Sequence, residues 1–365
     1  MRVLMTGGGT AGHVNPAIAI ANTIKKHHPD AIIEFVASNQ SKDKANDLVG
    51  RAGYKLHRVN ICGSYAIYDP RNLKTLYYMM KSAKEAKRLI LEFRPDVIIG
   101  TGGYACYPVL NEGAKLGIPT LVHESNAIPG RAVRKLAGRV DVVMTNFKSS
   151  ADALVDAKKV ICVGNPTLFE INTATVAPRN DGFVRHVVSF GGSGGAENLN
   201  LQMCKVISKL APIFPDTEFY HAAGKRDFEN TRANFEQNGL MNMKNVKLVE
   251  YIYDMNERMA TADLLICRAG AMTVSELALM GKAAIFVPSP YVAANHQYKN
   301  AKAIYDADAC ELVEEKEFDS GRLEDVVAEL LKNDGRRLTM SDNIKSFAVS
   351  DANEKIYKEI MTLIG

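Results

Sequence analysis

Two glycine-rich turns and one histidine are the residues of this chain best suited to carry out chemistry. The first turn, residues 7–9, follows the apolar run at residues 3–5 and leads to His13. The second turn, residues 191–195, follows a similar run at residues 187–190. Glycine lets backbone N–H groups approach a ligand closely, and the start of a following helix carries a partial positive charge. A strand, a glycine turn and a helix in that order predict a phosphate site, and here the order occurs twice.

His13 directly follows Gly12 and precedes Pro16, a residue that suits the start of a helix. An imidazole at this point can accept a proton from a hydroxyl group near neutral pH. A lone histidine is more often a packing or capping residue, so both roles stay open. Its place beside a glycine turn favours catalysis, and the pair of turns indicates an enzyme that handles a nucleotide-linked substrate.

A third turn, residues 268–270, follows an expected strand at residues 264–267 and opens a helix that contains Glu276. This helix start adds another N-terminus that can bind an anion. The Glu276 carboxylate can accept two hydrogen bonds from the neighbouring hydroxyls of a ribose. The structural alternative is a favourable charge on the helix dipole, worth about 0.3–1 kcal/mol.

Polar loops follow other expected strands. Asn295, His296 and Gln297 offer neutral donors and acceptors that suit sugar hydroxyls. In the first half, the segments at residues 102–104 and 123–126 also follow strand ends, where α/β proteins bind ligands, although either could equally be a structural turn. These motifs bring no set of carboxylates together, so we expect no bound metal.

Gly7, Gly9 and Gly12 also fit the GxGxxG pattern of dinucleotide sites. Such a site needs an acidic residue at the end of the second strand to hold the ribose. Glu34 has about the right spacing but lies in the middle of the expected strand, which ends near Ser38. The sequence therefore disfavours a nicotinamide or flavin cofactor, and we expect none.

Alternating strands and helices must position these turns. The first half predicts strands at residues 2–6, 31–37, 55–60, 97–100, 120–123, 140–144 and 160–163, and helices at 15–28, 43–52, 72–93 and 108–116. The second half predicts strands at residues 186–190, 217–222, 246–249, 264–267 and 283–287, and helices at 198–210, 273–280, 297–306, 321–332, 336–346 and 352–363. This alternation is typical of parallel sheets covered by helices, and it predicts an α/β protein with two Rossmann-like domains facing one cleft.

The periodicity fails between residues 165 and 182, where Pro166, Pro178 and Gly182 interrupt it. We therefore expect a first domain at residues 1–164, a linker at 165–182, a second domain at 183–340 and a C-terminal segment at 341–365. A length of 365 residues suits two domains.

The composition is that of a globular protein, with 47% apolar and 24% charged residues. There is no run of 18 apolar residues and no signal-peptide pattern, so we expect no membrane-spanning segment. The six cysteines are scattered without a CxxC pair, and they are expected to be buried thiols in a reducing cytosol.

Charge is distributed unevenly between the two halves. Residues 1–165 hold 23 Lys and Arg against 13 Asp and Glu, whereas residues 166–365 hold 22 against 28. A basic half favours an anionic partner such as a phosphorylated substrate or a membrane surface, with a solvated basic face as the structural alternative. No basic run is interleaved with aromatic residues, so we expect no nucleic acid as a partner.

Six motifs follow one another in the order found in a known family. They are GGGTAGHVNPAIAIA from Gly7, IIGTGGYACYP from Ile98, LVHESNAIPG from Leu121, SFGGSGGAENLN from Ser189, CRAGAMTVSELALMG from Cys267 and NHQYKNA from Asn295. Together they resemble the MurG family of peptidoglycan N-acetylglucosaminyltransferases along nearly the whole chain. The resemblance implies a GT-B glycosyltransferase whose N-terminal half holds the acceptor and whose C-terminal half holds UDP-GlcNAc. It also implies that the final helix returns to the first domain.

The family resemblance further implies an inverting transfer of GlcNAc from UDP-GlcNAc to the 4-hydroxyl of the MurNAc-pentapeptide of undecaprenyl-linked lipid I, giving lipid II without an essential metal. His13 matches the candidate base. Asn126 matches a contact to the donor sugar, Ser193 a contact to the diphosphate and Ile252 a contact to the uracil. The positions that match the UDP-GlcNAc site are Thr10, Ala11, Gly12, Asn126, Ser193, Ile252, Ala271, Met272, Thr273, Val274, Ser275, Glu276 and Gln297.

Two positions depart from the family pattern. Leu168 stands where the family often has an arginine that helps bind the donor, so Arg268 is a candidate to compensate. His296 replaces the first of two paired glutamines, and its role stays open. A related GT-B transferase acting on diacylglycerol or another lipid-linked sugar is the alternative enzyme. A nucleotide-sugar binding module without catalysis would keep the second-half motifs but would not need His13.

The polyprenyl chain of the implied acceptor stays in the membrane. Within the expected helix at residues 72–93, Leu73, Leu76, Tyr77 and Met80 recur at helical spacing among several lysines. Such a stripe is more often a core face than a membrane contact, but the basic first half and the lipid-anchored acceptor favour docking on anionic lipids of the inner leaflet. We therefore expect a peripheral protein at the cytoplasmic face of the cell membrane.

Overall fold

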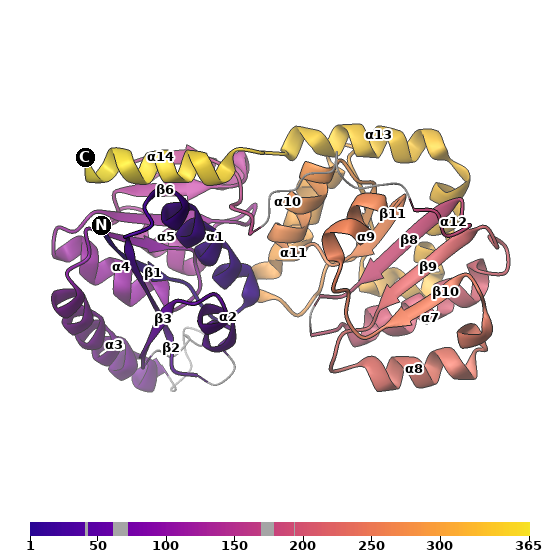
Figure 1. Ribbon diagram of the computed structural model, residues 1–365, viewed down its shortest axis with the longest axis horizontal. Coiled ribbons are helices and arrows are strands. Elements are labelled where there is room, and N and C mark those ends of the chain that lie inside the picture. Colours follow the sequence, from indigo (N-terminus) through magenta and orange to yellow (C-terminus); the bar gives the residue numbers. More distant parts are fainter. Residues whose placement is uncertain (41–42, 61–71, 169–178, 193) are drawn as a thin grey trace. The chain divides into compact units, whose positions relative to one another are not determined.

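The structure, a computed structural model, describes residues 1–40, 43–60, 72–168, 179–192 and 194–365, without the side chains of residues 72–79 and 293. The chain forms two compact units (Figure 1). The first contains residues 1–170 and 349–365, and the second contains residues 171–348. Ser193, Cys62 and the expected linker between residues 169 and 178 lie outside the described residues.

The first unit is built on a parallel sheet with the strand order β3-β2-β1-β4-β5-β6-β7. Its strands are β1 (Arg2–Thr6), β2 (Ile32–Ser38), β3 (Lys55–Val59), β4 (Val97–Gly100), β5 (Thr120–Glu124), β6 (Val142–Thr145) and β7 (Val160–Cys162). Its helices are α1 (Ala11–His27), α2 (Ala45–Arg51), α3 (Asn72–Phe93), α4 (Cys106–Lys115), α5 (Arg131–Leu136), α6 (Lys148–Asp152) and α14 (Ala352–Ile364).

The central strands of this sheet are buried on both faces. The side chains of Val97, Ile98 and Ile99 in β4 are fully buried, as expected for a short apolar run in a parallel sheet. One core cluster includes Phe35 and Ile24, and the other includes Ile98 and Leu110. Helices therefore cover both faces, and the sheet is the scaffold that carries the loops at its carboxyl edge.

The last helix, α14, belongs to the first unit although the chain reaches it from the second. Ile356 and Ile360 are buried in the same core cluster as α1. The ring of Tyr357 stacks on His27 at 4.1 Å between ring centroids, and its hydroxyl lies 2.8 Å from His28 Nε2. These contacts hold α14 against α1 (Figure 1).

The second unit is built on a parallel sheet with the strand order β10-β9-β8-β11-β12-β13. Its strands are β8 (Arg185–Phe190), β9 (Thr217–Ala222), β10 (Val246–Val249), β11 (Leu264–Cys267), β12 (Ala284–Phe286) and β13 (Glu311–Leu312). Its α-helices are α7 (Glu197–Leu210), α8 (Phe228–Gln237), α9 (Met255–Thr261), α10 (Ala271–Met280), α11 (His296–Tyr305), α12 (Arg322–Lys332) and α13 (Asp334–Ile344). Its 3-10 helices are η2 (Leu240–Asn242), η3 (Ala293–Asn295), η4 (Glu315–Ser320) and η5 (Lys345–Phe347).

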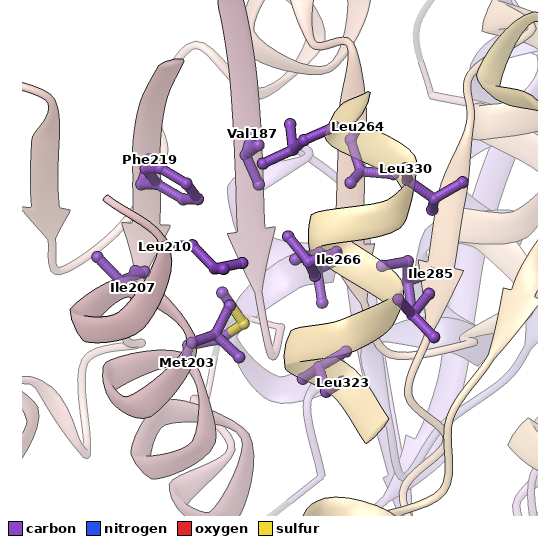
Figure 2. Close-up of a cluster of buried hydrophobic side chains, with 14 of the residues drawn as sticks. Val187, Met203, Ile207, Leu210, Phe219, Leu264, Ile266, Ile285, Leu323 and Leu330 are labelled. Carbon is purple, nitrogen blue, oxygen red and sulfur yellow. The ribbon is translucent and has the colours of Figure 1, made fainter. Parts of the chain in front are cut away.

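Helices α7 and α12 cover one face of this sheet. Figure 2 shows Met203 and Leu210 of α7 and Leu323 and Leu330 of α12 packed around Ile266 of β11. The apolar residues of both helices recur every three or four positions, so each helix presents one apolar stripe to the strands. Two parallel sheets covered by helices confirm the predicted α/β class with two Rossmann-like units.

Three local expectations differ from the structure. Helix α1 begins at Ala11, directly after the extended residue Thr10, so Pro16 lies inside the helix and not at its start. Proline lacks the N–H that would donate to the Gly12 carbonyl, so α1 forms without that hydrogen bond. Cys162 is exposed at the end of the edge strand β7, whereas Cys106, Cys204, Cys267 and Cys310 are buried as expected.

The second unit also runs farther than the sequence indicates, to Ala348 and not to residue 340. Helix α13 continues to Ile344, and η5 then contacts α10, where a Cβ atom on Gly281 would lie 2.4 Å from the Lys345 side chain. Within the part of the chain that the structure describes, no helix is long and apolar enough to cross a membrane.

Candidate functional site

Each unit has a topological switch point, where the strand order reverses and ligands bind in open α/β sheets. In the first unit it lies between β1 and β4, so the turn at residues 7–10 adjoins the turn at residues 101–104. In the second unit it lies between β8 and β11, so residues 191–192 and 194–196 after β8 adjoin the turn at residues 268–270. The glycine-rich motifs of the sequence therefore sit at the two places where the topology favours a ligand.

His13 is held by the neighbouring turn through both its ring and its backbone. Its Nδ1 atom lies 3.0 Å from the Thr101 carbonyl oxygen, and a carbonyl only accepts, so Nδ1 carries the proton. The Thr101 hydroxyl donates to the His13 carbonyl at 2.6 Å. This pairing sets the tautomer of the neutral ring and places its lone pair on Nε2, the form that a proton acceptor requires.

The residues just before His13 form the start of α1. Thr10 has extended backbone angles and precedes the helix, and Thr10 and Gly12 are exposed while Ala11 is half-buried. The first backbone N–H groups of a helix have no partner within the helix. The structure thus places all three predicted residues at a helix start that faces solvent.

Asn126 follows β5 and is oriented by Glu124. Both the backbone N–H and the side-chain NH2 of Asn126 donate to Glu124 Oε1 at 2.9 Å. The other oxygen of this buried carboxylate accepts from the Gly130 N–H at 2.7 Å, at the start of α5. Sequence reasoning named Glu124 only as part of a loop; the structure makes it the residue that sets the direction of Asn126.

The run from Ala271 to Glu276 forms the first turns of α10, with Gly270 as the preceding extended residue. Ala271, Val274 and Ser275 are buried, and Met272, Thr273 and Glu276 are half-buried. The first turn contains no acidic residue, so Glu276 lies beyond the reach of the strongest dipole effect. Its carboxylate forms no hydrogen bond or ion pair with the residues that the structure describes, and burial raises the pKa of Glu276 to about 7.

Gln297 lies at the second position of α11 and is tied to the loop after β12. Its side-chain oxygen accepts from the Ser289 N–H at 2.8 Å, which turns the carboxamide NH2 group away from that loop. His296 begins the same helix and is half-buried. The fixed amide of Gln297 can offer its N–H donors to a ligand oxygen.

Ile252 follows β10 with its side chain fully buried, between two exposed tyrosines. Tyr251 and Tyr253 are 43% and 90% exposed, and their rings meet edge to face at 5.1 Å between centroids. A buried side chain cannot contact a base directly, so any contact from Ile252 must come from its backbone.

Leu168 stands where the family often has an arginine, and Arg268 is the residue suggested to compensate for that missing cation. The Arg268 guanidinium donates to the Val287 carbonyl at 3.0 Å and forms an ion pair with Glu315. Asn198, at the start of α7, donates to the other Glu315 oxygen at 2.7 Å. The cation is therefore engaged within the second unit, and Leu168 packs against the core of the first.

A buried polar chain supports the second glycine turn, and sequence reasoning missed it. Ser189 Oγ lies 2.8 Å from His221 Nδ1, and His221 Nε2 lies 3.1 Å from Asn200 Oδ1. The Asn200 NH2 group donates to the Ala223 carbonyl, so Asn200 Oδ1 is the atom that accepts from His221. His221 therefore carries its proton on Nε2, and its Nδ1 accepts from the Ser189 hydroxyl. Burial lowers the pKa of His221 to about 4, so this histidine stays neutral and structural. These residues lie on different strands and helices, so no local pattern signals them.

One group of side chains within the described residues has the spacing of metal ligands. Asp181, His186 and Glu218 bring their ligand atoms within 4.8 Å of one another. Arg179 contacts the Glu218 carboxylate at 3.0 Å, and Arg258 contacts it at 3.4 Å. The group lies at the beginning of β8 and β9, at the opposite end of these strands from the glycine turn, so it is an ion-pair network outside the candidate site.

Comparisons with known proteins identify the same two halves. Residues 3–145 match the glycosyltransferase family 28 N-terminal domain, and residues 186–356 match the glycosyltransferase family 28 C-terminal domain. The chain is 37% identical over 372 residues to the UDP-N-acetylglucosamine–N-acetylmuramyl-(pentapeptide) pyrophosphoryl-undecaprenol N-acetylglucosamine transferase of Acetivibrio thermocellus, covering 100% of this chain and 98% of that protein. The enzyme of the same name from Thermoanaerobacter pseudethanolicus is 38% identical, with both chains fully covered.

Solved structures show the same architecture. The crystal structure of Acinetobacter baumannii MurG aligns with a TM-score of 0.78 and 26% identity, covering 99% of each chain. The UDP-GlcNAc 2-epimerase from Neisseria meningitidis, bound to UDP-GlcNAc, aligns with a TM-score of 0.69 at 15% identity, over 99% of this chain and 100% of the epimerase. At that identity the second likeness reports on the fold alone.

Proposed function

The chain belongs to glycosyltransferase family 28, and from this premise we propose that it transfers N-acetylglucosamine from UDP-GlcNAc to a lipid-linked acceptor. The acceptor is the 4-hydroxyl of N-acetylmuramyl-(pentapeptide) pyrophosphoryl-undecaprenol, lipid I, and the product is lipid II. The full-length relatives carry this activity in their names. The reaction inverts the anomeric centre, because one hydroxyl displaces UDP directly.

The second unit supplies the groups that a departing UDP needs. The start of α10 offers backbone N–H groups and the positive end of a helix dipole to the diphosphate. Glu276 forms no hydrogen bond or ion pair with the described residues, so its carboxylate is suited to accept hydrogen bonds from both ribose hydroxyls. Gln297 donates to the GlcNAc hydroxyls, Ile252 reads the uracil through its backbone, and Ser193 joins the diphosphate contacts.

His13 is the base of the proposed reaction. The observation that carries this role is the hydrogen bond from Nδ1 to the Thr101 carbonyl, because it leaves Nε2 as the basic nitrogen of the neutral ring. Nε2 takes the proton of the acceptor hydroxyl while the new glycosidic bond forms and the bond to UDP breaks. Thr10, Ala11 and Gly12 border the same turn, and Asn126 orients the donor sugar.

The first unit brings the enzyme to its lipid-linked acceptor. It carries the excess of basic residues, and on α3 the side chains of Met80 and Leu91 are 69% and 55% exposed. Apolar insertion together with attraction to anionic lipid holds a protein on a bilayer surface. We place the enzyme at the cytoplasmic face of the cell membrane as a peripheral protein.

The direct test is turnover with purified lipid I and radiolabelled UDP-GlcNAc. We expect labelled lipid II with an inverted anomeric centre, little transfer from UDP-glucose and none to diacylglycerol. His13→Ala should lower kcat about 10²–10⁴-fold with a smaller effect on UDP-GlcNAc binding, because the base acts in the transition state. Activity should persist in EDTA, because N–H groups and helix termini meet the phosphate charge. Transfer to diacylglycerol but not to lipid I would overturn the assignment.

A further inference from the structure

Asp43 is a buried carboxylate that none of the roles above uses. It lies two residues before α2 and is 1% exposed. Its Oδ1 atom accepts from the backbone N–H of Gly9 at 2.8 Å and from that of Ala45 at 3.0 Å. Its Oδ2 atom accepts from the Ser38 N–H at 3.3 Å. One side chain thus joins the end of β2, the start of α2 and the glycine turn after β1.

The glycine turn lies so close to this carboxylate that only glycine fits. A Cβ atom on Gly8 would lie 2.7 Å from Asp43 Oδ2, a distance that real Cβ contacts do not show. Gly9 has a φ of +91°, in the left-handed region that favours glycine, and its N–H points at Asp43 Oδ1. The glycines of this turn therefore allow close contact with Asp43, as well as any contact with a ligand.

The opposite side of the turn packs against the residues that hold His13. A Cβ atom on Gly103 would lie 2.3 Å from the Gly8 carbonyl oxygen, and one on Gly7 would lie 2.3 Å from Thr101 Oγ1. Thr101 is also the residue whose carbonyl oxygen accepts from the His13 ring. The turn at residues 7–9 is thus clamped between Asp43 and the segment that fixes the imidazole.

We propose that Asp43 is a positioning residue for His13, acting through the glycine turn. The carboxylate takes up one of the N–H groups that such a turn offers to a bound anion, so the turn is ordered before any substrate arrives. Because Asp43 holds the turn on one side, the turn keeps Thr101 in place on its other side. Thr101 can then hold the His13 ring through its carbonyl oxygen. This inference rests on the proposed role of His13 as the base.

The test compares Asp43→Ala, Asp43→Asn and a matched control. Asp47→Ala removes an exposed carboxylate from α2 that has no partner among the described residues, so it should behave as wild type. Asp43→Ala should lower kcat about 10–100-fold, because a misplaced catalytic group loses rate steeply. Its UDP affinity by calorimetry should stay within about twofold, since the residues proposed to contact UDP itself lie in the second unit. Asp43→Asn keeps an acceptor for Gly9 and should recover part of the rate.

A second readout follows the His13 ring itself. In ¹⁵N-histidine NMR spectra, the signal that disappears in His13→Ala identifies His13, and its shifts report which nitrogen carries the proton. We expect the Nδ1-protonated form in wild type and Asp47→Ala, and a mixture of tautomers in Asp43→Ala. Should Asp43→Ala fail to bind UDP or to fold, Asp43→Asn decides the question by the same two readouts.

The outcomes separate this inference from the proposed function. Wild-type kcat and an unchanged His13 signal in a folded Asp43 variant overturn the positioning role. Full activity in His13→Ala overturns the proposed base instead, and the NMR spectra then still report whether Asp43 orders the ring. A fall in kcat with an unchanged His13 tautomer would also overturn the inference, because Asp43 would then act by another route.

Discussion

Burial determines what a single carboxylate can do in the second unit. Glu276 lies near the start of α10 without a hydrogen-bonding partner among the described residues, and burial raises its pKa to about 7 from an ordinary value of 4.5. A group in this state is poor for stability and useful for binding, because a ligand hydroxyl can supply the missing hydrogen bonds. For Glu276 we therefore expect one effect on ligand binding and one on stability.

UDP-GlcNAc affinity should rise with pH through about 7. Below that pH Glu276 is protonated in most molecules, and the ribose diol then loses the charged acceptor of its hydrogen bonds. With a pKa of about 7, the ionised fraction at pH 6 is about one tenth, so affinity should be up to about tenfold weaker at pH 6 than at pH 8. Calorimetry with UDP-GlcNAc measures this, and Glu276→Gln should bind weakly at both pH values. The same pH dependence in Glu276→Gln would remove Glu276 from the binding site.

The unliganded enzyme should become more stable when Glu276 is made neutral. The folded-state pKa lies above the unfolded value, so the folded protein binds the extra proton between pH 4.5 and 7, and stability falls as pH rises through that window. Glu276→Gln should therefore raise the free energy of unfolding by about 1–3 kcal/mol at pH 8 and by little at pH 4.5. Thermal melts at both pH values measure the difference. An equal change at both would point to packing as the cause.

Gly102 lies in the turn that holds the His13 ring, so a substitution there changes the position of the proposed base. A Cβ atom at this position would lie 2.9 Å from His13 Nδ1, and the residue has a φ of +93°. Gly102→Ala should push the imidazole off the Thr101 carbonyl and lower kcat about 10²-fold. UDP binding by calorimetry should be unchanged, because the residues proposed to contact UDP itself lie in the second unit. Gly117→Ala is the control, since it also has a positive φ but its Cβ would meet nothing within 4 Å.

At the scale of elements, the exposed apolar residues of α3 are the candidate contact with lipid. Met80 is 69% exposed, whereas Leu76 belongs to the side chains outside the described residues. Ala86, Ile90 and Phe93 of the same helix are buried at helical spacing, so one face of α3 packs against the core and Met80 lies outside that face. The sequence alone left the choice between core and membrane open, and at Met80 the structure favours a surface role.

The double variant Leu76→Glu/Met80→Glu should bind anionic vesicles more weakly than the wild type. Added salt should also weaken vesicle binding by the wild type. UDP affinity and the melting temperature should be retained. Val155→Glu is the matched control, because Val155 is 87% exposed in the same unit but lies outside α3. Vesicle sedimentation measures the binding. If the double variant unfolds, the stripe is core; if it folds and still sediments, the docking surface lies elsewhere.

At the scale of the whole molecule, the chain crosses between its two units twice. Within the first unit, the segment before the first crossing contacts the segment after the second. The Thr167 N–H donates to Asn353 Oδ1 at 3.0 Å, and the Asn353 NH2 group donates to the Thr167 carbonyl oxygen at 3.0 Å. A Cβ atom on Gly164 would lie 2.5 Å from Val349. Beyond this point α14 completes the core of the first unit with Ile356 and Ile360.

Ile356→Ala and Ile360→Ala should each destabilise the first unit by about 2–5 kcal/mol, because both side chains are fully buried. UDP binding should survive in the double variant, since the residues proposed to contact UDP itself lie within residues 171–348. Leu338→Ala is the control, because Leu338 is 65% exposed on α13. Calorimetric melts with and without UDP separate the two transitions. A loss of UDP affinity equal to the loss of stability would mean that the units unfold as one.

The sequence was sufficient for features that arise within a few residues. Apolar runs, glycine turns and helical periodicity predicted most of the strands and longer helices, because backbone preference and amphipathicity are local properties. The short helices α5, α6 and α9 and the polar helix α8 carry little periodicity, and these the sequence missed. The types of residue at the candidate site were equally readable, since Gly7, His13 and Glu276 stand inside local motifs.

The tertiary structure alone decided how those motifs are held. Asp43 meets Gly9 across 34 positions, Thr101 sets the His13 tautomer across 88, and Glu315 engages Arg268 across 47. The Thr101 contact exists because β4 lies beside β1, although β2 and β3 come between them in the chain. The Asp43 contact exists because β2 lies on the other side of β1, and the Glu315 contact forms within the second unit. Strand order depends on how the whole set of apolar faces packs together, and no short stretch of sequence encodes that choice. The same is true of α14, whose buried face is defined only by the core that it joins.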